Sequence, residues 1–299
     1  MSRAKGKRFA DKKSVAFSGK KNNKKRLNTN DKNKKRLDID DNNKKNNKKN
    51  KKKNKIVYNL IIVVCLCVIV YSLYNIIVWA IENKKNNELL ADIQSIAGIT
   101  HEEIVVDNNS IVKTNYDFTE LLNKNPNTVG WIYVPNSKID YPVVQASDND
   151  FYLNHSFNNT ENSAGWVFAD SACDVVKSKN VVLYGHNRKD QSMFGSLKKV
   201  QDDEWLSNPN NHYITFANLN ETGIYKIFSV FVVNDEHVNS YLETNFSSDE
   251  AFRSYLKKIK NTSSMQFDTD IENTESIITL YTCYGMNNQR LVVFAAKVY

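Results

Sequence analysis

Cysteine, proline and glycine are all scarce in this 299-residue sequence, which contains four, four and nine of them respectively. Cys65 and Cys67 lie within one long apolar run, so only Cys173 and Cys283 remain outside it. Two thiols do not make the disulfide framework of a small secreted scaffold. A bridge between Cys173 and Cys283 is the one disulfide that this count leaves open, and it would consume a candidate nucleophile.

Two kinds of binding motif are also missing from the sequence. No pair of cysteines or histidines has the spacing of metal ligands, and the carboxylates are scattered along the chain. No glycine-rich phosphate loop occurs either. We therefore expect neither a metal site nor a cofactor, and the sequence contains no internal repeat. Apolar residues make up 41% of the chain, which is enough for a substantial core.

The net charge of +8 is the sum of two opposed regions. Residues 1–55 contain 23 Lys and Arg against 5 Asp, whereas the rest of the chain contains 18 Lys and Arg against 28 Asp and Glu. The first region has few large apolar side chains, so we expect a disordered basic tail. A basic tail can bind nucleic acid or anionic lipid. Because a membrane span follows directly, lipid attraction is sufficient, and we expect no nucleic-acid partner.

Residues 56–81 contain no charged side chain. At 1.5 Å per residue this run is long enough for the roughly 30 Å of a hydrocarbon core, so it predicts a transmembrane helix. A cleaved signal peptide is the alternative, but the run is too long and lacks a small-residue cleavage site. The lysine-rich flank precedes the span, so we expect a single-pass membrane protein with a cytoplasmic N-terminus and an extracellular C-terminal domain.

The segment that follows, residues 82–125, is predicted to be a helical region or stalk. Leu89, Leu90, Ile93 and Ile96 recur at helical spacing, so residues 83–96 are expected to form an amphipathic helix, as a stalk or packed on the domain. Residues 118–125 are typical of a second, shorter helix that ends before Pro126.

Residues 126–299 contain short β-branched and aromatic runs separated by turn residues, which predict a mainly β domain, either a closed barrel or a sandwich. Helices are expected at 150–155, 193–200 and 249–259, and the apolar stripe of the last indicates core packing rather than a ligand site. The expected strands are 129–134, 141–144, 165–168, 181–184, 213–217, 224–233, 276–282 and 291–298.

Three chemically useful side chains lie at the ends of these strands. Cys283 follows one buried strand, and Arg290 begins the next after a turn at 284–289, so the two side chains are expected to face one pocket. His186 follows the strand 181–184 and Gly185. Nearby positive charge lowers the pKa of a thiol, so a cysteine with arginine and imidazole indicates an acyl-transfer centre. The other histidines, His101, His155, His212 and His237, lack such a context.

Each of these residues also has a structural interpretation. Free cysteine is among the most buried residue types, so Cys283 alone is compatible with an inert core thiol. A lone histidine such as His186 is usually structural. Arg290 as a surface charge is disfavoured, because four apolar residues follow it directly.

The segment 279–283, TLYTC, with Arg290 resembles the TLxTC and arginine signature of sortases. The segment YGHN at 184–187, continuing as KDQSMFG at 189–195, resembles the histidine segment of class B sortases. The similarity includes TVGWIYVP at 128–135 and IDYPVVQ at 139–145, and it covers roughly residues 85–299. It implies an eight-stranded β-barrel with N-terminal helices and a helix in the long connection before the cysteine strand.

The resemblance also implies a reaction. The Cys283 thiolate attacks the threonine carbonyl of a C-terminal sorting pentapeptide in a surface protein, and an amine of a peptidoglycan precursor or cross-bridge resolves the thioacyl enzyme. His186 acts as general acid and then as general base, and Arg290 holds a substrate carbonyl or the oxyanion. The candidate substrate-binding residues are Thr282, Tyr281 and Asn187.

Tyr281 departs from the small residue or serine expected at its position in class B. Whether its ring faces the side of Cys283 is left open by the sequence, and substrate choice depends on the answer. Three alternatives also stay open: a pilin-polymerising sortase, a hydrolase in which water replaces the amine, and a membrane-tethered scaffold whose thiol is incidental.

Overall fold

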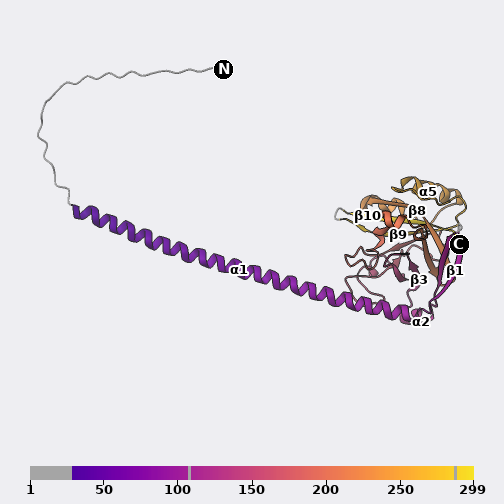
Figure 1. The fold of residues 1–299 in the computed structure, drawn as a ribbon, viewed down its shortest axis with the longest axis horizontal. Helices are drawn as coiled ribbons and strands as arrows, with labels where there is room; N and C mark the ends of the chain where they lie inside the picture. Colours follow the sequence, from indigo (N-terminus) through magenta and orange to yellow (C-terminus); the bar gives the residue numbers. More distant parts are fainter. Residues whose placement is uncertain (1–28, 107–108, 286–287) are drawn as a thin grey trace, which may run out of the picture. The chain divides into compact units, whose positions relative to one another are not determined.

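The computed structural model describes residues 29–106, 109–285 and 288–299. The chain divides into two compact units, residues 1–72 and residues 73–299. A single helix, α1 (Thr29–Ile96), runs through the boundary between them (Figure 1). Within the described residues, α1 is the one helix long and apolar enough to cross a membrane, and it contains the predicted span 56–81.

The prediction of a disordered tail was wrong for residues 29–55, which are helical in the structure. Lysine and arginine are good helix formers, and the apolar segment that follows provides a nucleus from which the helix extends at low cost. Residues 1–28 of the predicted tail lie outside the described residues.

The second unit contains a closed barrel of eight strands in the order β10-β8-β7-β3-β4-β5-β6-β9, which confirms a barrel and excludes the sandwich. Two neighbouring pairs, β4 with β5 and β6 with β9, are parallel, and the other neighbouring pairs of the barrel are antiparallel. The strands are β3 (Thr128–Tyr133), β4 (Asp140–Val144), β5 (Phe168–Ala169), β6 (Asn180–Tyr184), β7 (Tyr213–Asn218), β8 (Thr222–Asn234), β9 (Ile277–Tyr284) and β10 (Gln289–Lys297).

Strand β5 is shorter and later than the predicted strand 165–168. Gly165 has φ +58°, which is a left-handed conformation and not an extended one. The Trp166 N–H donates to the Tyr152 carbonyl in a neighbouring turn. The backbone at the start of the predicted strand is therefore hydrogen-bonded to a loop and not to a neighbouring barrel strand.

A β-hairpin interrupts the region 82–125, which the sequence predicts to be a helical region or stalk. It comprises β1 (Thr100–Val106) and β2 (Asn109–Asn115) and forms a separate two-stranded sheet. Its apolar face, with Ile104, Val106 and Ile111, packs on Tyr213 and Ile224 of the barrel. Val105, between Ile104 and Val106, is apolar although it is exposed, so the apolar and polar alternation of a half-buried strand is broken. Tertiary packing therefore decides the structure here.

The predicted helix 83–96 is confirmed as the last part of α1. Ile93 is fully buried in the main core, and Leu89, Leu90 and Ile96 pack against that core. The segment is therefore docked on the barrel domain and is not a free stalk. The predicted helix 118–125 corresponds to α2 (Thr119–Lys124).

The other predicted helices are found at α5 (Asp249–Thr262), at η1 (Phe151–Leu153) and at η2 (Leu197–Gln201), the last two being single 3₁₀ turns. Short turns were not predicted because four residues carry little periodicity. They are α3 (Asp203–Leu206), η3 (Pro209–His212), α4 (Asp235–Val238) and η4 (Asn239–Tyr241).

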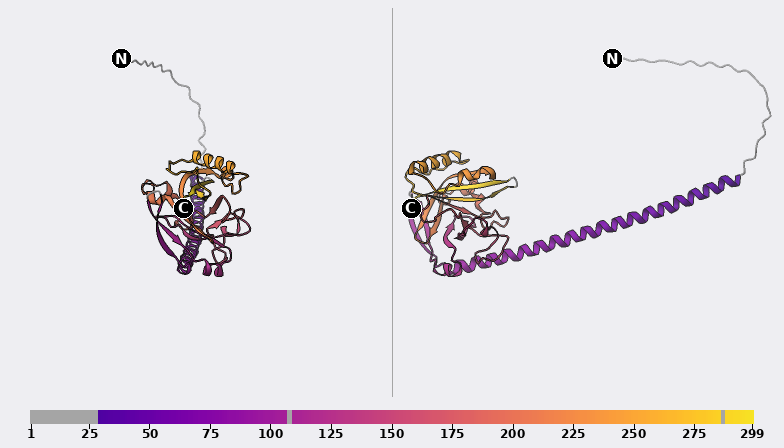
Figure 2. Two further views of the ribbon diagram at one scale, coloured as in Figure 1. Left: turned by 90° about the vertical axis from the view of Figure 1, so that its right-hand side faces the viewer. Right: turned by 180° about the vertical axis from the view of Figure 1, so that it is seen from behind.

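Helix α5 lies in the long connection between β8 and β9 and packs on the outer face of the barrel, on the opposite side from α2 (Figures 1 and 2). The Ser248 hydroxyl caps its first turn by accepting from the Ala251 N–H. Its buried face joins a cluster with Phe228, Phe231, Val292 and Phe294 of β8 and β10. The stripe predicted as core packing is confirmed.

We predict that Leu256→Ala lowers the free energy of unfolding by about 2–5 kcal/mol, because it removes a side chain that is 1% exposed and leaves a cavity. Ser254→Ala on the exposed face of α5 is the control and should change stability by less than about 0.5 kcal/mol. The measurement is urea unfolding of the detergent-solubilised chain, followed by tryptophan fluorescence. Equal midpoints for the two variants would contradict the packing described here.

Candidate active site

The pairing of three strands brings the predicted residues together at one edge of the barrel. Arg290 on β10 pairs directly with Cys283 on β9. Strand β6 runs parallel to β9 with Tyr184 opposite Tyr281, so Gly185 and His186 follow β6 at the edge where Cys283 lies. Directly opposed side chains in an antiparallel pair point to the same face of the sheet. The thiol and the guanidinium are therefore neighbours on one surface.

These residues line a cavity of about 360 Å³. Cys283 is exposed and reduced, so its thiol is accessible from solvent. The exposure of Cys283 thus argues against its interpretation as an inert core thiol. The residues lining the cavity are Asn149, Leu153, Phe168, Tyr184, Gly185, His186, Tyr281, Thr282, Cys283 and Arg290.

Tyr281 lies on the same side of β9 as Cys283 and contacts Arg290, which answers the question the sequence left open. The Arg290 Nε donates to the Tyr281 hydroxyl at 2.7 Å. That hydroxyl donates to the Asp235 carboxylate at 3.1 Å, and Asp235 Oδ1 is also 3.0 Å from Arg290 Nε. Tyr281 and Asp235 therefore together fix the plane of the guanidinium.

Two pKa values describe the electrostatics of this cluster. Burial raises the pKa of Tyr281 to about 12, so its hydroxyl stays protonated and can donate to Asp235. Partial burial alone would lower the pKa of Arg290, but the bond to Tyr281 and the nearby Cys283 and Asp235 outweigh it and raise that pKa. Arg290 is a permanent cation beside the thiol.

Arg290 retains hydrogen-bonding capacity toward the cavity. Its Nη1 donates to the Gln289 carbonyl at 3.1 Å. Nη2 has no hydrogen-bond partner within the ranges 29–106, 109–285 and 288–299. An arginine that is oriented through one side of its guanidinium and open on the other can donate to an incoming oxygen.

His186 is oriented by a backbone carbonyl that the sequence did not indicate. Its Nε2 is 2.7 Å from the Leu153 carbonyl oxygen. A carbonyl only accepts, so Nε2 carries the proton and Nδ1 is the atom that exchanges a proton in the neutral ring. The His186 imidazole thus has a fixed orientation at the cavity wall.

Gly165 makes the contact between His186 and Leu153 possible. A Cβ at this position would lie 2.7 Å from the Leu153 oxygen and 3.0 Å from His186 Cδ2. The positive φ of Gly165 also disfavours any L side chain there. No motif in the sequence marked this glycine, because its role depends on two segments distant from it along the chain.

Thr282 connects the strand that carries Cys283 to the segment that carries His186. Its side chain is 2% exposed, and its hydroxyl donates to the Gly185 carbonyl at 2.7 Å. The Gly185 N–H donates in turn to the Tyr281 carbonyl at 3.3 Å. Asn187, also predicted to bind substrate, is exposed, forms a bridge with Met193 and is not among the residues lining the cavity.

Cys173 is not bonded to Cys283, since both are free thiols, and the disulfide alternative was wrong. Cys173 is buried, accepts from the Val182 N–H and donates to the Asn180 carbonyl. Burial raises the pKa of this thiol to about 12. It is a packed, unreactive thiol beside β6.

Comparison with known proteins gives a consistent result. The sortase domain family matches residues 132–298. Sortase B of Listeria monocytogenes is 33% identical over 226 residues, which cover 74% of this chain and 87% of that protein.

Two solved structures show the same fold. Sortase B from Bacillus anthracis in complex with AAEK1 has a TM-score of 0.61 and 34% identity, covering 73% of this chain and 98% of the other. The Staphylococcus aureus sortase B-substrate complex has a TM-score of 0.55 and 28% identity, covering 60% and 84% respectively.

A closed eight-stranded barrel with a thiol, an imidazole and an arginine at one edge defines a cysteine transpeptidase of the sortase type. The chain belongs to the sortase family, and its relatives are class B sortases. The resemblance of the TLYTC and YGHN segments is thereby confirmed.

We predict that Tyr281→Phe lowers kcat/KM for peptide cleavage about tenfold, because it removes the hydroxyl that orients Arg290 and leaves the ring in place. Tyr184→Phe is the matched control, since Tyr184 lines the same cavity but its hydroxyl bonds to Asp170. A loss of the same size in both variants, or in neither, would contradict the role assigned to Tyr281.

Proposed function

We propose that this chain cleaves a C-terminal sorting signal in surface proteins and transfers the cleaved protein to a peptidoglycan amine. The observation that carries the proposal is the direct pairing of Cys283 with Arg290 in the cavity that also contains His186. A relative, the Staphylococcus aureus sortase B, has been solved with a substrate, which supports a peptide in the corresponding place here.

In the first half-reaction the Cys283 thiol proton has passed to His186, and the resulting thiolate attacks the threonine carbonyl carbon of the sorting signal. The carbonyl π electrons move to oxygen, and the Arg290 guanidinium donates to the resulting oxyanion. The intermediate collapses by breaking the C–N bond, and His186 Nδ1 gives a proton to the departing amine. The product is a thioester between Cys283 and the shortened surface protein.

In the second half-reaction an amine of a peptidoglycan precursor or cross-bridge attacks the thioester carbonyl. His186 accepts the proton that the amine loses, and the C–S bond breaks to restore the thiolate. The result is a new amide bond. The Leu153 carbonyl holds Nε2–H in both steps, so the same imidazole nitrogen serves as acid and then as base.

We further propose that residues 56–81 anchor the protein in the cell membrane, with the N-terminus cytoplasmic and the barrel outside. The absence of charge in this run and the lysine-rich flank before it support this topology. In the second half-reaction two other nucleophiles compete with the peptidoglycan amine. One is the lysine of a pilin subunit, and the other is water.

The test is intact-mass spectrometry of the detergent-solubilised full chain, incubated with a library of sorting-signal peptides and with triglycine as the amine. A thioacyl adduct on Cys283 that moves to triglycine is the expected result. An adduct resolved only by water would favour the hydrolase. Absence of an adduct, together with a Cys283 that resists small electrophiles, would favour the scaffold.

We predict that Cys283→Ala abolishes the adduct, and that His186→Ala lowers kcat about 10²–10⁴-fold through loss of general acid–base catalysis. Arg290→Ala should lower kcat about 10²–10³-fold, as expected for loss of an oxyanion donor. Arg290→Lys should recover only part of this loss. The planar guanidinium of arginine has separate N–H donors for the Tyr281 hydroxyl and for an oxyanion, and the compact ammonium of lysine does not reproduce this arrangement. Circular dichroism controls for folding, and activity retained in any alanine variant would remove that residue from the mechanism.

A further inference from the structure

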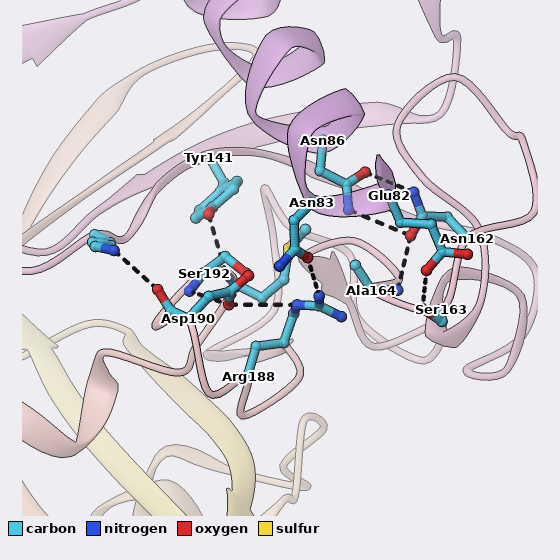
Figure 3. A network of polar contacts seen from close by, with 12 residues as sticks. Glu82, Asn83, Asn86, Tyr141, Asn162, Ser163, Ala164, Arg188, Asp190 and Ser192 are labelled. Carbon is cyan, nitrogen blue, oxygen red and sulfur yellow. Dashed lines mark hydrogen bonds and ion pairs between the residues drawn. The ribbon is translucent and has the colours of Figure 1, made fainter. Parts of the chain in front are cut away.

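The turn of α1 that follows the apolar run contacts two loops of the catalytic domain (Figure 3). We call residues 82–86 the juxtamembrane turn. The first loop, residues 154–165, comes directly after Leu153, and the second, residues 187–195, comes directly after His186. All of these residues belong to the same compact unit.

The juxtamembrane turn holds the loop 154–165 through polar contacts. The Ser163 hydroxyl donates to Glu82 Oε2 at 2.6 Å. Asn86, which is 8% exposed, exchanges two side-chain hydrogen bonds with Asn162, at 2.6 and 3.3 Å. Asn162 in turn accepts from the Ala164 N–H and, through its backbone carbonyl, from the Gly165 N–H. The turn therefore fixes the end of the loop that contains Gly165.

The same turn also holds the loop 187–195. Arg188 Nη2 donates to Asn83 Oδ1, and Arg188 Nε lies 3.5 Å from Asp190 Oδ1. Asp190 Oδ1 accepts from both the backbone N–H and the hydroxyl of Ser192. The Arg188 side chain is only 11% exposed, so this arrangement is largely shielded from solvent.

Both loops determine where the His186 ring lies. Leu153, directly before the first loop, accepts the hydrogen bond from Nε2, and Gly165, at the end of that loop, leaves the room for the ring. In the second loop the Phe194 N–H donates to the His186 carbonyl at 3.0 Å. His186 is thus bracketed by two segments, and each of them also contacts the juxtamembrane turn.

Helical geometry explains why one turn can bridge both loops. Asn86 lies four positions after Glu82 and three after Asn83, so its side chain is a neighbour of both on the surface of α1. The same side of the helix carries Ile93, which is buried in the core.

We propose that the juxtamembrane turn is a positioning element for His186, so that the helix entering from the membrane is part of the framework of the active site. The proposal rests on the proposed function for the role of His186. Asn83 and Asn86 act through Arg188 and Asn162 and do not contact the substrate cavity.

The test compares Asn83→Ala and Asn86→Ala with Asn87→Ala in the full chain in detergent. Asn87 is the neighbouring asparagine and is exposed, so it is a matched control. We expect kcat for peptide cleavage to fall about ten- to a hundredfold in the double variant Asn83→Ala/Asn86→Ala, with KM nearly unchanged, as for a misplaced catalytic group. Asn87→Ala should behave as the wild type.

A conservative substitution separates positioning from general stability. Asn83→Asp keeps an acceptor oxygen for Arg188, so it should retain most of the activity that Asn83→Ala loses. The urea midpoint of each variant is measured in parallel. The proposal would be overturned if kcat fell only in proportion to the urea unfolding midpoint. It would also be overturned if the double variant had the same kcat as Asn87→Ala.

A second readout does not depend on turnover. Hydrogen exchange at the Gly165 and Phe194 amides reports the order of the two loops, and both amides should exchange faster in the double variant than in Asn87→Ala. Unchanged exchange would overturn the proposal even if no peptide is cleaved. A wild-type chain that forms no thioacyl adduct would contradict the proposed function, and the exchange result would still decide the role of the turn.

Discussion

The active site depends on the pairing of β9 with two different strands. Its antiparallel ladder with β10 sets Cys283 opposite Arg290, and its parallel ladder with β6 brings Gly185 alongside Tyr281. Because side chains alternate along a strand, a shift of either register by one residue would turn a functional group to the other face. The buried Thr279 and Thr282 make this register specific, since their hydroxyls bond to Asn180 and to the Gly185 carbonyl.

The polar cluster around Arg290 acts on geometry more than on stability. The Asp235 side chain is 43% exposed and that of Arg290 is 17% exposed. An ion pair with such exposure contributes little to the free energy of unfolding. The ion pair matters because Tyr281 adds a second contact, and together the two contacts fix the guanidinium from one side. Among the described residues Nη2 has no partner, so we propose that it is the nitrogen that donates to the substrate.

The residues proposed to carry the chemistry could be located from the sequence because each lies at the end of a recognisable strand. Apolar β-branched runs located β6, β9 and β10, and the turn between β9 and β10 placed Cys283 near Arg290. Residues 286–287 of that turn lie outside the described residues. The eight runs alone predicted a barrel or a sandwich, and the resemblance to sortases favoured the barrel, whereas the order in which the strands close was not predictable.

The residues that orient this chemistry were not predictable in the same way. Asp235 meets Arg290 only because Asn234, at the end of β8, pairs with Gln289. Leu153 contributes a backbone carbonyl, which any residue type has, and Gly165 matters only for the space it leaves. The juxtamembrane contacts of Asn83 and Asn86 join segments about 80–100 residues apart, for which local patterns contain no signal.

The most direct test of the account is a crystal structure of the catalytic domain with a sorting-signal analogue bound covalently to Cys283. The account predicts that the thioester carbonyl oxygen lies within about 3 Å of an Arg290 nitrogen, with Tyr281 and Asp235 still bonded to Nε and His186 still bonded to the Leu153 carbonyl. A carbonyl oxygen that points away from Arg290, or an Arg290 that leaves Tyr281 to pair elsewhere, would contradict it.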